Sequence, residues 1–141
     1  MDTEQMKLRC PCSVEVGVAH VNGYRFAMDE AGVATIILDN SKHIEGLLWL
    51  VTPDDIKSLD RYEGVAAEAY RKEYIDVRQN GVRQQALVYV SCRPLWDGKT
   101  RREGYMERIC SAATSLKLTP EYIQMLQTYR GNKSVDYISS K

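Results

Sequence analysis

The residues with the clearest chemical potential lie in one pentapeptide, Asp60-Arg61-Tyr62-Glu63-Gly64. Glu63 falls at the end of a predicted helix, where its charge faces the negative end of the helix dipole and the free carbonyls. That field, together with partial burial, raises the pKa of a carboxyl group and suits it to proton transfer near neutral pH. Gly64 permits the turn that directs Glu63 inward, and Tyr70 opens the next strand and offers a phenol beside the carboxylate.

A second interpretation of the same residues involves no chemistry. Glu63 is then an exposed residue at a helix end, and Tyr62 and Tyr70 are aromatic residues of the core. The pattern taken alone favours this second interpretation, because a single carboxylate is a weak signal of catalysis.

The thiols and imidazoles give no comparable signal. None of them stands at the spacing of a redox pair or a zinc site; they are Cys10, Cys12, Cys92, Cys110, His20 and His43. The two histidines show no acidic or thiol neighbour at ligand spacing, so we expect no metal site and no cofactor. The Cys/His dyad of a thiol hydrolase stays open, but no flanking residue supports one.

The charge balance argues against a polyanionic partner. Lys and Arg number 19, as do Asp and Glu, so the formal net charge is zero and no long-range field favours nucleic acid. The basic stretch 99–102 is interpreted as a solvated loop. No apolar run is long enough to span a bilayer, and the first residues are not a signal peptide. We therefore expect a soluble, cytoplasmic protein with neither nucleic-acid nor membrane partners.

The elements around the pentapeptide are well marked. Thr52 caps a helix, Pro53 occupies its first position, two aspartates follow in the first turn, and Gly64 ends it. Residues 70–77 alternate as a strand, Asn80-Gly81 predicts a hairpin turn, and residues 85–92 form the returning strand.

The rest of the chain is predicted to hold more strands, with helices at both ends. Residues 2–9 form a short helix that Asp2 can cap, and strands follow from Val14, with turns at Asn22-Gly23, 30–32 and 40–42. Residues 105–116 repeat at helical spacing, and Thr119-Pro120-Glu121 begins another helix. The fold class is α+β: a small, mostly antiparallel curled sheet or barrel with flanking helices. We expect a single domain over residues 1–141, with a flexible tail after about residue 131.

Three blocks of the sequence resemble one family, the γ-glutamylcyclotransferase-like (AIG2-like) proteins. The central block comprises residues 45–50, 59–65 and Tyr70. The segments 5–11, 23–26 and 34–36 upstream, and 105–110 and 118–122 downstream, are similar to bacterial members in the same order. The resemblance extends from about the start of the chain to Leu126.

The resemblance implies a cyclotransfer reaction. The α-amine of a γ-glutamyl amino acid or amine attacks its own γ-carbonyl, closes a five-membered ring and releases 5-oxoproline. Glu63 matches the family's acid/base residue, and the resemblance places Tyr70, Tyr105 and Gly64 around the substrate. It implies no metal or cofactor. The alternative from another class is a non-catalytic small-molecule binding domain, or a structural domain with a vestigial pocket.

The sequence departs from the family at its beginning. Family members start with a strand and a Tyr-Gly-Ser-Asn-type loop whose backbone N–H groups hold the γ-glutamyl unit, and Met1 falls directly after the place of that loop. Either the chain is a truncated form of a longer product, or it is naturally short. A short chain leaves a sheet edge unpaired, from which we expect a homodimer formed through that edge.

Overall fold

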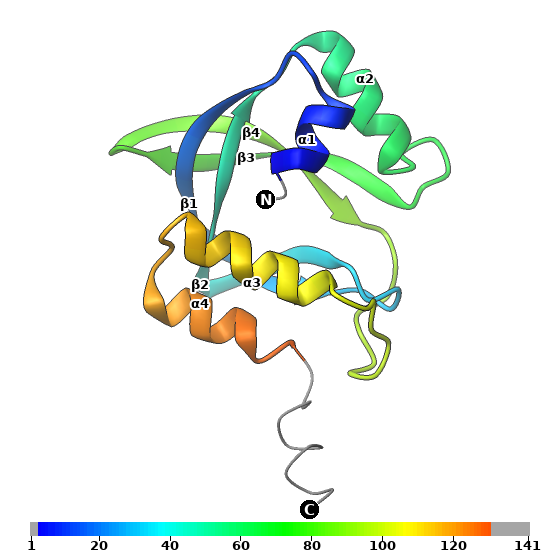
Figure 1. The fold of residues 1–141 in the computed structure, drawn as a ribbon, viewed down its shortest axis with the longest axis vertical. Coiled ribbons are helices and arrows are strands. Elements are labelled where there is room, and N and C mark those ends of the chain that lie inside the picture. Colours follow the sequence, from blue (N-terminus) through cyan, green and yellow to red (C-terminus); the bar gives the residue numbers. More distant parts are fainter. Residues whose placement is uncertain (1–2, 131–141) are drawn as a thin grey trace, which may run out of the picture.

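The computed structural model describes residues 3–130, which fold into four helices and four strands (Figure 1). The predicted cap at Asp2 and the predicted tail after residue 131 lie outside this range. In chain order the elements are α1 (Thr3–Arg9), β1 (Val14–Met28), β2 (Ala34–Leu50), α2 (Pro53–Tyr62), β3 (Tyr70–Gln79), β4 (Val82–Ser91), α3 (Tyr105–Ser115) and α4 (Pro120–Gln127). The predicted α+β class is confirmed.

The four strands form one antiparallel sheet in the order β2-β1-β3-β4. β1 and β2 pair along almost their whole length, and β3 and β4 form a regular hairpin through Asn80-Gly81, as predicted. The two hairpins are joined by the pairing of His20 with Arg78.

Two of the predicted turns do not exist. Asn22-Gly23 lies inside β1, and residues 40–42 lie inside β2. The two segments face each other across the β1–β2 pair, where the register shifts between Asn22 and Tyr24 and Gly23 has a φ of +88°. The polar residues and the glycine therefore form an irregularity in two long paired strands, as in a β-bulge, and the chain does not reverse there. The predicted turn at 30–32 is the real connection between β1 and β2.

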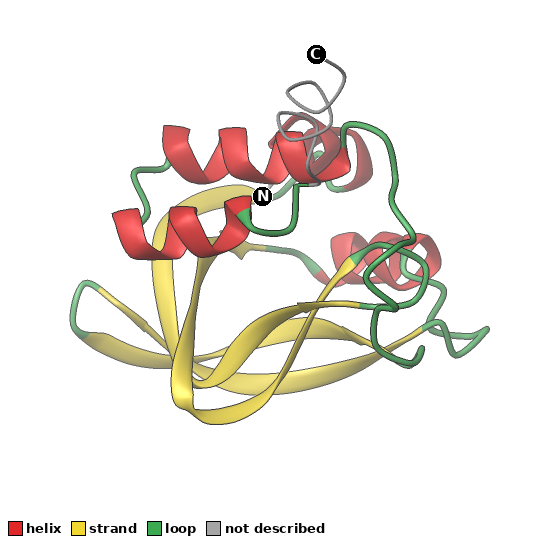
Figure 2. Cartoon of the chain, turned by 90° about the horizontal axis from the view of Figure 1, so that it is seen from below, coloured by secondary structure: helices red, strands yellow, loops and turns green. Residues whose placement is uncertain are grey.

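Helices cover one side of the curved sheet (Figure 2). α3 and α4 lie side by side, and their apolar faces pack against the end of β1. The buried cluster between them consists of Phe26, Met28, Met106, Cys110, Ala113, Leu118, Tyr122 and Leu126. A second buried cluster lies on β1 and β3 and consists of Ala19, Val21, Ile75 and Val77. This packing fixes the position of the first residue of α3, which matters for the site below.

At the opposite end of the molecule, α1 packs on α2 (Figure 1). The Ser58 hydroxyl donates a hydrogen bond of 2.6 Å to the Arg9 carbonyl, and the Arg9 guanidinium lies 4.5 Å from the centroid of the Tyr62 ring. α2 begins as predicted: the Asp55 N–H donates to Thr52 Oγ1 at 3.1 Å, and the Thr52 N–H donates to Asp55 Oδ2 at 3.0 Å. This reciprocal capping box, with Pro53 in the first turn, fixes where the helix starts.

The predicted alternative of a barrel is wrong, because the sheet is not closed. Its edge strands, β2 and β4, approach each other where Ser91 N–H donates to Thr35 Oγ1 at 3.0 Å, but they form no ladder among the described residues. Among those residues, no helix is long and apolar enough to cross a bilayer.

Candidate functional site

Glu63 stands at the C-terminal cap of α2. Gly64 follows with a φ of +66°, the left-handed conformation that glycine adopts without a steric penalty. Val65 N–H donates to the Asp60 carbonyl at 3.0 Å and Gly64 N–H to the Arg61 carbonyl at 3.2 Å. These are the two hydrogen bonds of a Schellman motif. The sequence signal at Gly64 therefore corresponds to a defined local structure that sets the direction of the chain on either side.

The last turn of α2 is also tied to the sheet. Asp60 accepts a hydrogen bond of 2.6 Å from the Tyr89 hydroxyl of β4 and one of 3.1 Å from Lys72 Nζ of β3. These two hydrogen bonds fix the end of α2 to the sheet at a point three residues before Glu63.

The Glu63 side chain is half-buried. Burial raises the pKa of its carboxyl group, and the nearby charges of Arg9 and Arg93 lower it only in part. The direction of this shift is the one that the sequence predicted. No hydrogen bond from a described residue contributes to this shift, which suits the carboxylate to exchanging a proton with a ligand.

Tyr70 and Tyr105 lie near Glu63. Tyr70 is the first residue of β3 and Tyr105 the first of α3. Burial raises the pKa of both phenols, and the charges of Asp29 and Glu63 raise both pKa values further. Both phenols therefore keep their protons. The Tyr105 oxygen accepts the Ala34 N–H at 2.8 Å, which orients the hydroxyl and leaves its proton available for donation.

Two charged residues that sequence analysis missed complete this group. Asp29 is fully buried, and its carboxylate accepts hydrogen bonds from Ser91 Oγ at 2.6 Å and from Arg93 Nη1 at 3.2 Å. Burial alone would raise the pKa of Asp29, but these bonds and those from the Val33 and Ala31 N–H groups lower it overall. The Arg93 guanidinium lies 5.6 Å from the centroid of the Tyr70 ring and is one-third exposed.

A signal for these two residues was present in the sequence. Asp29 follows an apolar strand directly and precedes a glycine turn, and Arg93 stands just beyond the end of another strand. Sequence reasoning had no means of pairing them, because the two residues are 64 positions apart in the chain and are brought together only by the sheet.

A cleft of about 250 Å³ opens beside the group, between the start of β2 and the end of β4. Arg93 lines it together with Thr35, Ile36, Leu38, Arg71 and Ser91, among others. Glu63, Tyr70 and Tyr105 do not line the cleft. We call Glu63, Tyr70, Tyr105, Asp29 and Arg93 together the Glu63 group. Arg93 is the residue that this group shares with the cleft.

One expectation about metal ligands needs correction. His43 does have an acidic neighbour: Glu45, two residues later on β2, accepts a hydrogen bond from His43 Nε2 at 2.8 Å, and His20 lies close to both. The thiols are free and scattered, with Cys10 and Cys110 buried and Cys12 and Cys92 exposed.

The sequence of this chain matches a family of known proteins and one named relative. The sequence model of the AIG2-like family matches residues 43–126, more than half of the chain. A γ-glutamylcyclotransferase from Mus musculus is 26% identical over an alignment of 153 residues. The alignment covers 99% of this chain and 79% of the mouse protein.

Solved structures agree on the fold. The structure of a γ-glutamyl cyclotransferase superposes with a TM-score of 0.75 at 23% identity, covering 89% of this chain and 79% of that one. An uncharacterized protein from Homo sapiens gives a TM-score of 0.77 at 22% identity, covering 99% and 92%. At these identities the likeness establishes the fold.

Proposed function

This chain belongs to the AIG2-like family, and we propose that it is a γ-glutamyl cyclotransferase that releases 5-oxoproline from γ-glutamyl amino acids or amines. The observation that supports the proposal most directly is the half-buried Glu63. The pKa of its carboxyl group is raised, and its charge in turn raises the pKa of the two phenols Tyr70 and Tyr105.

In the proposed reaction the substrate supplies its own nucleophile. The α-amine nitrogen bonds to the γ-carbonyl carbon, and the bond from that carbon to the leaving amine breaks. Because the two reacting groups belong to one molecule, holding them in a near-attack geometry gives a high effective molarity. The enzyme then has to move protons and stabilise the oxyanion.

Glu63 performs both proton steps in this scheme. Its carboxylate takes a proton from the α-ammonium group and gives it to the departing amine nitrogen. The ring nitrogen loses a second proton when it becomes an amide, and the released amine takes that proton up as its ammonium form, so no net proton is consumed. A raised pKa serves both steps, because general catalysis is most effective when the pKa of the group lies near the working pH. The half-buried Glu63 carboxylate is suited to this exchange.

The phenols serve as hydrogen-bond donors. Tyr105 is held by the Ala34 N–H, so its proton is available to the developing oxyanion. Tyr70 offers a second protonated phenol to the substrate. Arg93 is held by Asp29 and keeps further N–H donors for the substrate's α-carboxylate. Gly64 acts through the backbone turn that positions Glu63.

The experiment is 5-oxoproline release from a panel of γ-glutamyl amino acids and amines. We expect release by the unaltered chain and its loss in Glu63→Gln, which keeps the shape but cannot accept the proton. Glu68→Gln is the matched control, because it makes the same chemical change at an exposed glutamate five residues away. Equal activity in the Glu63→Gln variant would refute the assignment of Glu63.

A version extended by a strand bearing Tyr-Gly-Ser-Asn belongs in the same assay. If the extended version alone is active, the role of Glu63 stands and the loop is needed for turnover. If neither version is active, the alternative of a small-molecule binding or structural domain is favoured.

A further inference from the structure

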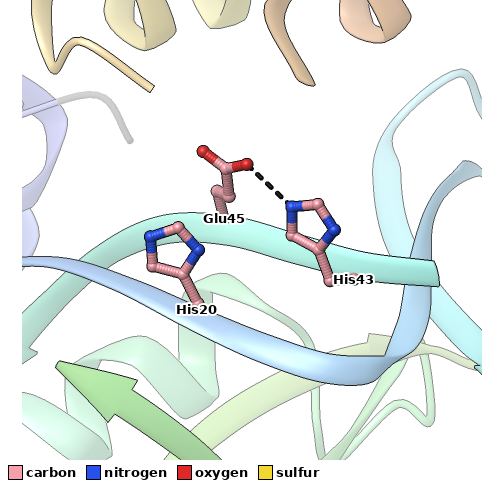
Figure 3. Close-up of side chains that lie close together, drawn as sticks. All are labelled: His20, His43 and Glu45. Atoms are coloured by element: carbon pink, nitrogen blue, oxygen red, sulfur yellow. Dashed lines mark hydrogen bonds and ion pairs between the residues drawn. The ribbon is translucent and has the colours of Figure 1, made fainter. Parts of the chain in front are cut away.

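Two histidines and a buried carboxylate meet on the paired strands β1 and β2 (Figure 3). His20 of β1 stands directly opposite Glu45 of β2 in the ladder, and His43 precedes Glu45 by two residues. Residues two apart on a strand face the same side of the sheet. All three side chains therefore project from one face, and these two are the only histidines in the chain.

The ligand atoms of the three side chains lie within 4.8 Å of one another. Donor atoms bound tetrahedrally to one Zn²⁺ at 2.0–2.2 Å lie about 3.3 Å apart. The two imidazole rings stack with centroids 6.1 Å apart, and both are exposed. Both rings are exposed, so rotation about their side-chain bonds is the movement that has to close the difference.

The carboxylate is the fixed member of the group. The Glu45 side chain is only 1% exposed, and Thr119 at the start of α4 holds both oxygens. Thr119 N–H donates to Oε1 at 2.9 Å, and the Thr119 hydroxyl donates to Oε2 at 2.5 Å. Outer partners of this kind orient a carboxylate ligand and strengthen metal binding.

We propose that His20, His43 and Glu45 form a binding site for a divalent transition-metal ion, with Zn²⁺ as its probe. The ion takes the place of the proton that His43 Nε2 and Glu45 Oε2 share at 2.8 Å. The lone pairs of both atoms then point to the metal, while Oε1 and Thr119 remain bonded as they are. No other bond within the group has to break.

The donor set indicates the kind of ion. Two imidazole nitrogens and one carboxylate oxygen suit zinc and its first-row neighbours rather than calcium or magnesium, which prefer oxygen donors. Three protein ligands leave the fourth tetrahedral position to water. The site is separate from the Glu63 group, with which it shares no residue.

The test is a titration of the untagged full chain with Zn²⁺ in competition with a chromophoric chelator. Co²⁺ replaces Zn²⁺ in a parallel experiment, where visible absorption bands report tetrahedral coordination. We expect one ion per chain. His20→Ala and His43→Ala should each weaken binding by more than the roughly 10–100-fold that loss of an outer-shell partner costs. Both histidines are exposed, and Thr119 still holds both oxygens of the buried carboxylate in either variant, so we expect both variants to fold.

The double variant Cys12→Ser/Cys92→Ser is the control, because it removes the two exposed thiols, the main competing ligands. Binding that survives this change and is lost with either histidine supports the site. Binding that disappears with the thiols, that is unchanged in both histidine variants, or that is absent from the unaltered chain overturns it.

Discussion

Replacement of Gly64 by alanine tests whether the turn after α2 positions Glu63. Gly64 has a φ of +66°, and a Cβ built there meets the Cβ of Ala69 at 3.2 Å. The left-handed conformation costs an alanine about 1–2 kcal/mol, and the less flexible unfolded chain offsets about 0.4–1 kcal/mol of this. We expect a net loss of about 1 kcal/mol in the free energy of unfolding.

Such a loss leaves a domain with about 5–15 kcal/mol of stability folded. A fall in 5-oxoproline release therefore reflects the position of Glu63 and not the amount of folded protein. A displacement of about 1 Å at a catalytic group can cost roughly 10²-fold in rate. We expect a decrease of this order in Gly64→Ala, measured beside urea unfolding of the same sample.

Gly81→Ala provides the matched control. Gly81 also has a positive φ, of +76°, but nothing lies within 4 Å of its added Cβ, and it sits in the β3–β4 turn. It should lose similar stability and keep full activity. Gly64→Asn should recover part of the activity, because asparagine tolerates the left-handed region better than alanine. If Gly64→Ala keeps full activity while losing stability, the turn does not position the carboxylate and the reasoning is wrong.

Three further predictions concern pH, folding and assembly. Because the folded-state pKa of Glu63 lies above its ordinary value of 4.5, this group favours folding at low pH and loses that contribution as pH rises through the folded pKa. Glu63→Gln should therefore be more stable than the unaltered chain at pH 7 and not at pH 4; the same difference at both pH values in chemical unfolding would contradict this. Thr52→Ala removes one half of the capping box and should lower the free energy of unfolding by about 0.5–2 kcal/mol, with Thr128→Ala, outside that box, as control; an unchanged urea midpoint would show that the cap is dispensable. We propose a homodimer through the open β2 edge, where Leu38 is 75% exposed; light scattering should find a dimer that Leu38→Lys dissociates, and a monomer at high concentration would rule it out.

The local signals predicted the elements well where they depend on a few neighbouring residues. Thr52 and Pro53 began α2, and Asn80-Gly81 turned the β3–β4 hairpin. The same Asn-Gly dipeptide at Asn22-Gly23 was misleading, because the long pairing of β1 with β2 continues through it. A dipeptide records only what its own backbone tolerates, whereas the strand partner decides whether the chain turns or merely bulges. The closed barrel failed for a related reason: strand count and alternation do not reveal whether the edge strands pair.

The three proposed metal ligands also could not be brought together from local sequence patterns alone. Scanning along the chain for closely spaced ligands passed over Glu45, although the two-residue period of a strand places it on the same face as His43. His20 joins them only through the register of β1 against β2, which no local pattern contains. Applying the strand period to every histidine in a predicted strand would have found one of the two contacts.

The proposed catalytic group is assembled almost wholly from the ends of elements. Glu63 caps the end of α2, Tyr70 and Tyr105 are the first residues of β3 and α3, and Asp29 and Arg93 follow β1 and β4 closely. Each position combines the rigidity of the element with the irregular backbone beyond it, where a side chain can leave the regular packing. Hydrogen bonds between these ends, such as Arg93 to Asp29 and Ala34 to Tyr105, then hold the group together. Glu63 and Gly64 could be singled out from the chain itself, because the helix end that marks them is a local signal. Asp29 and Arg93 could be found only in the folded sheet, because their contact joins strands far apart in sequence.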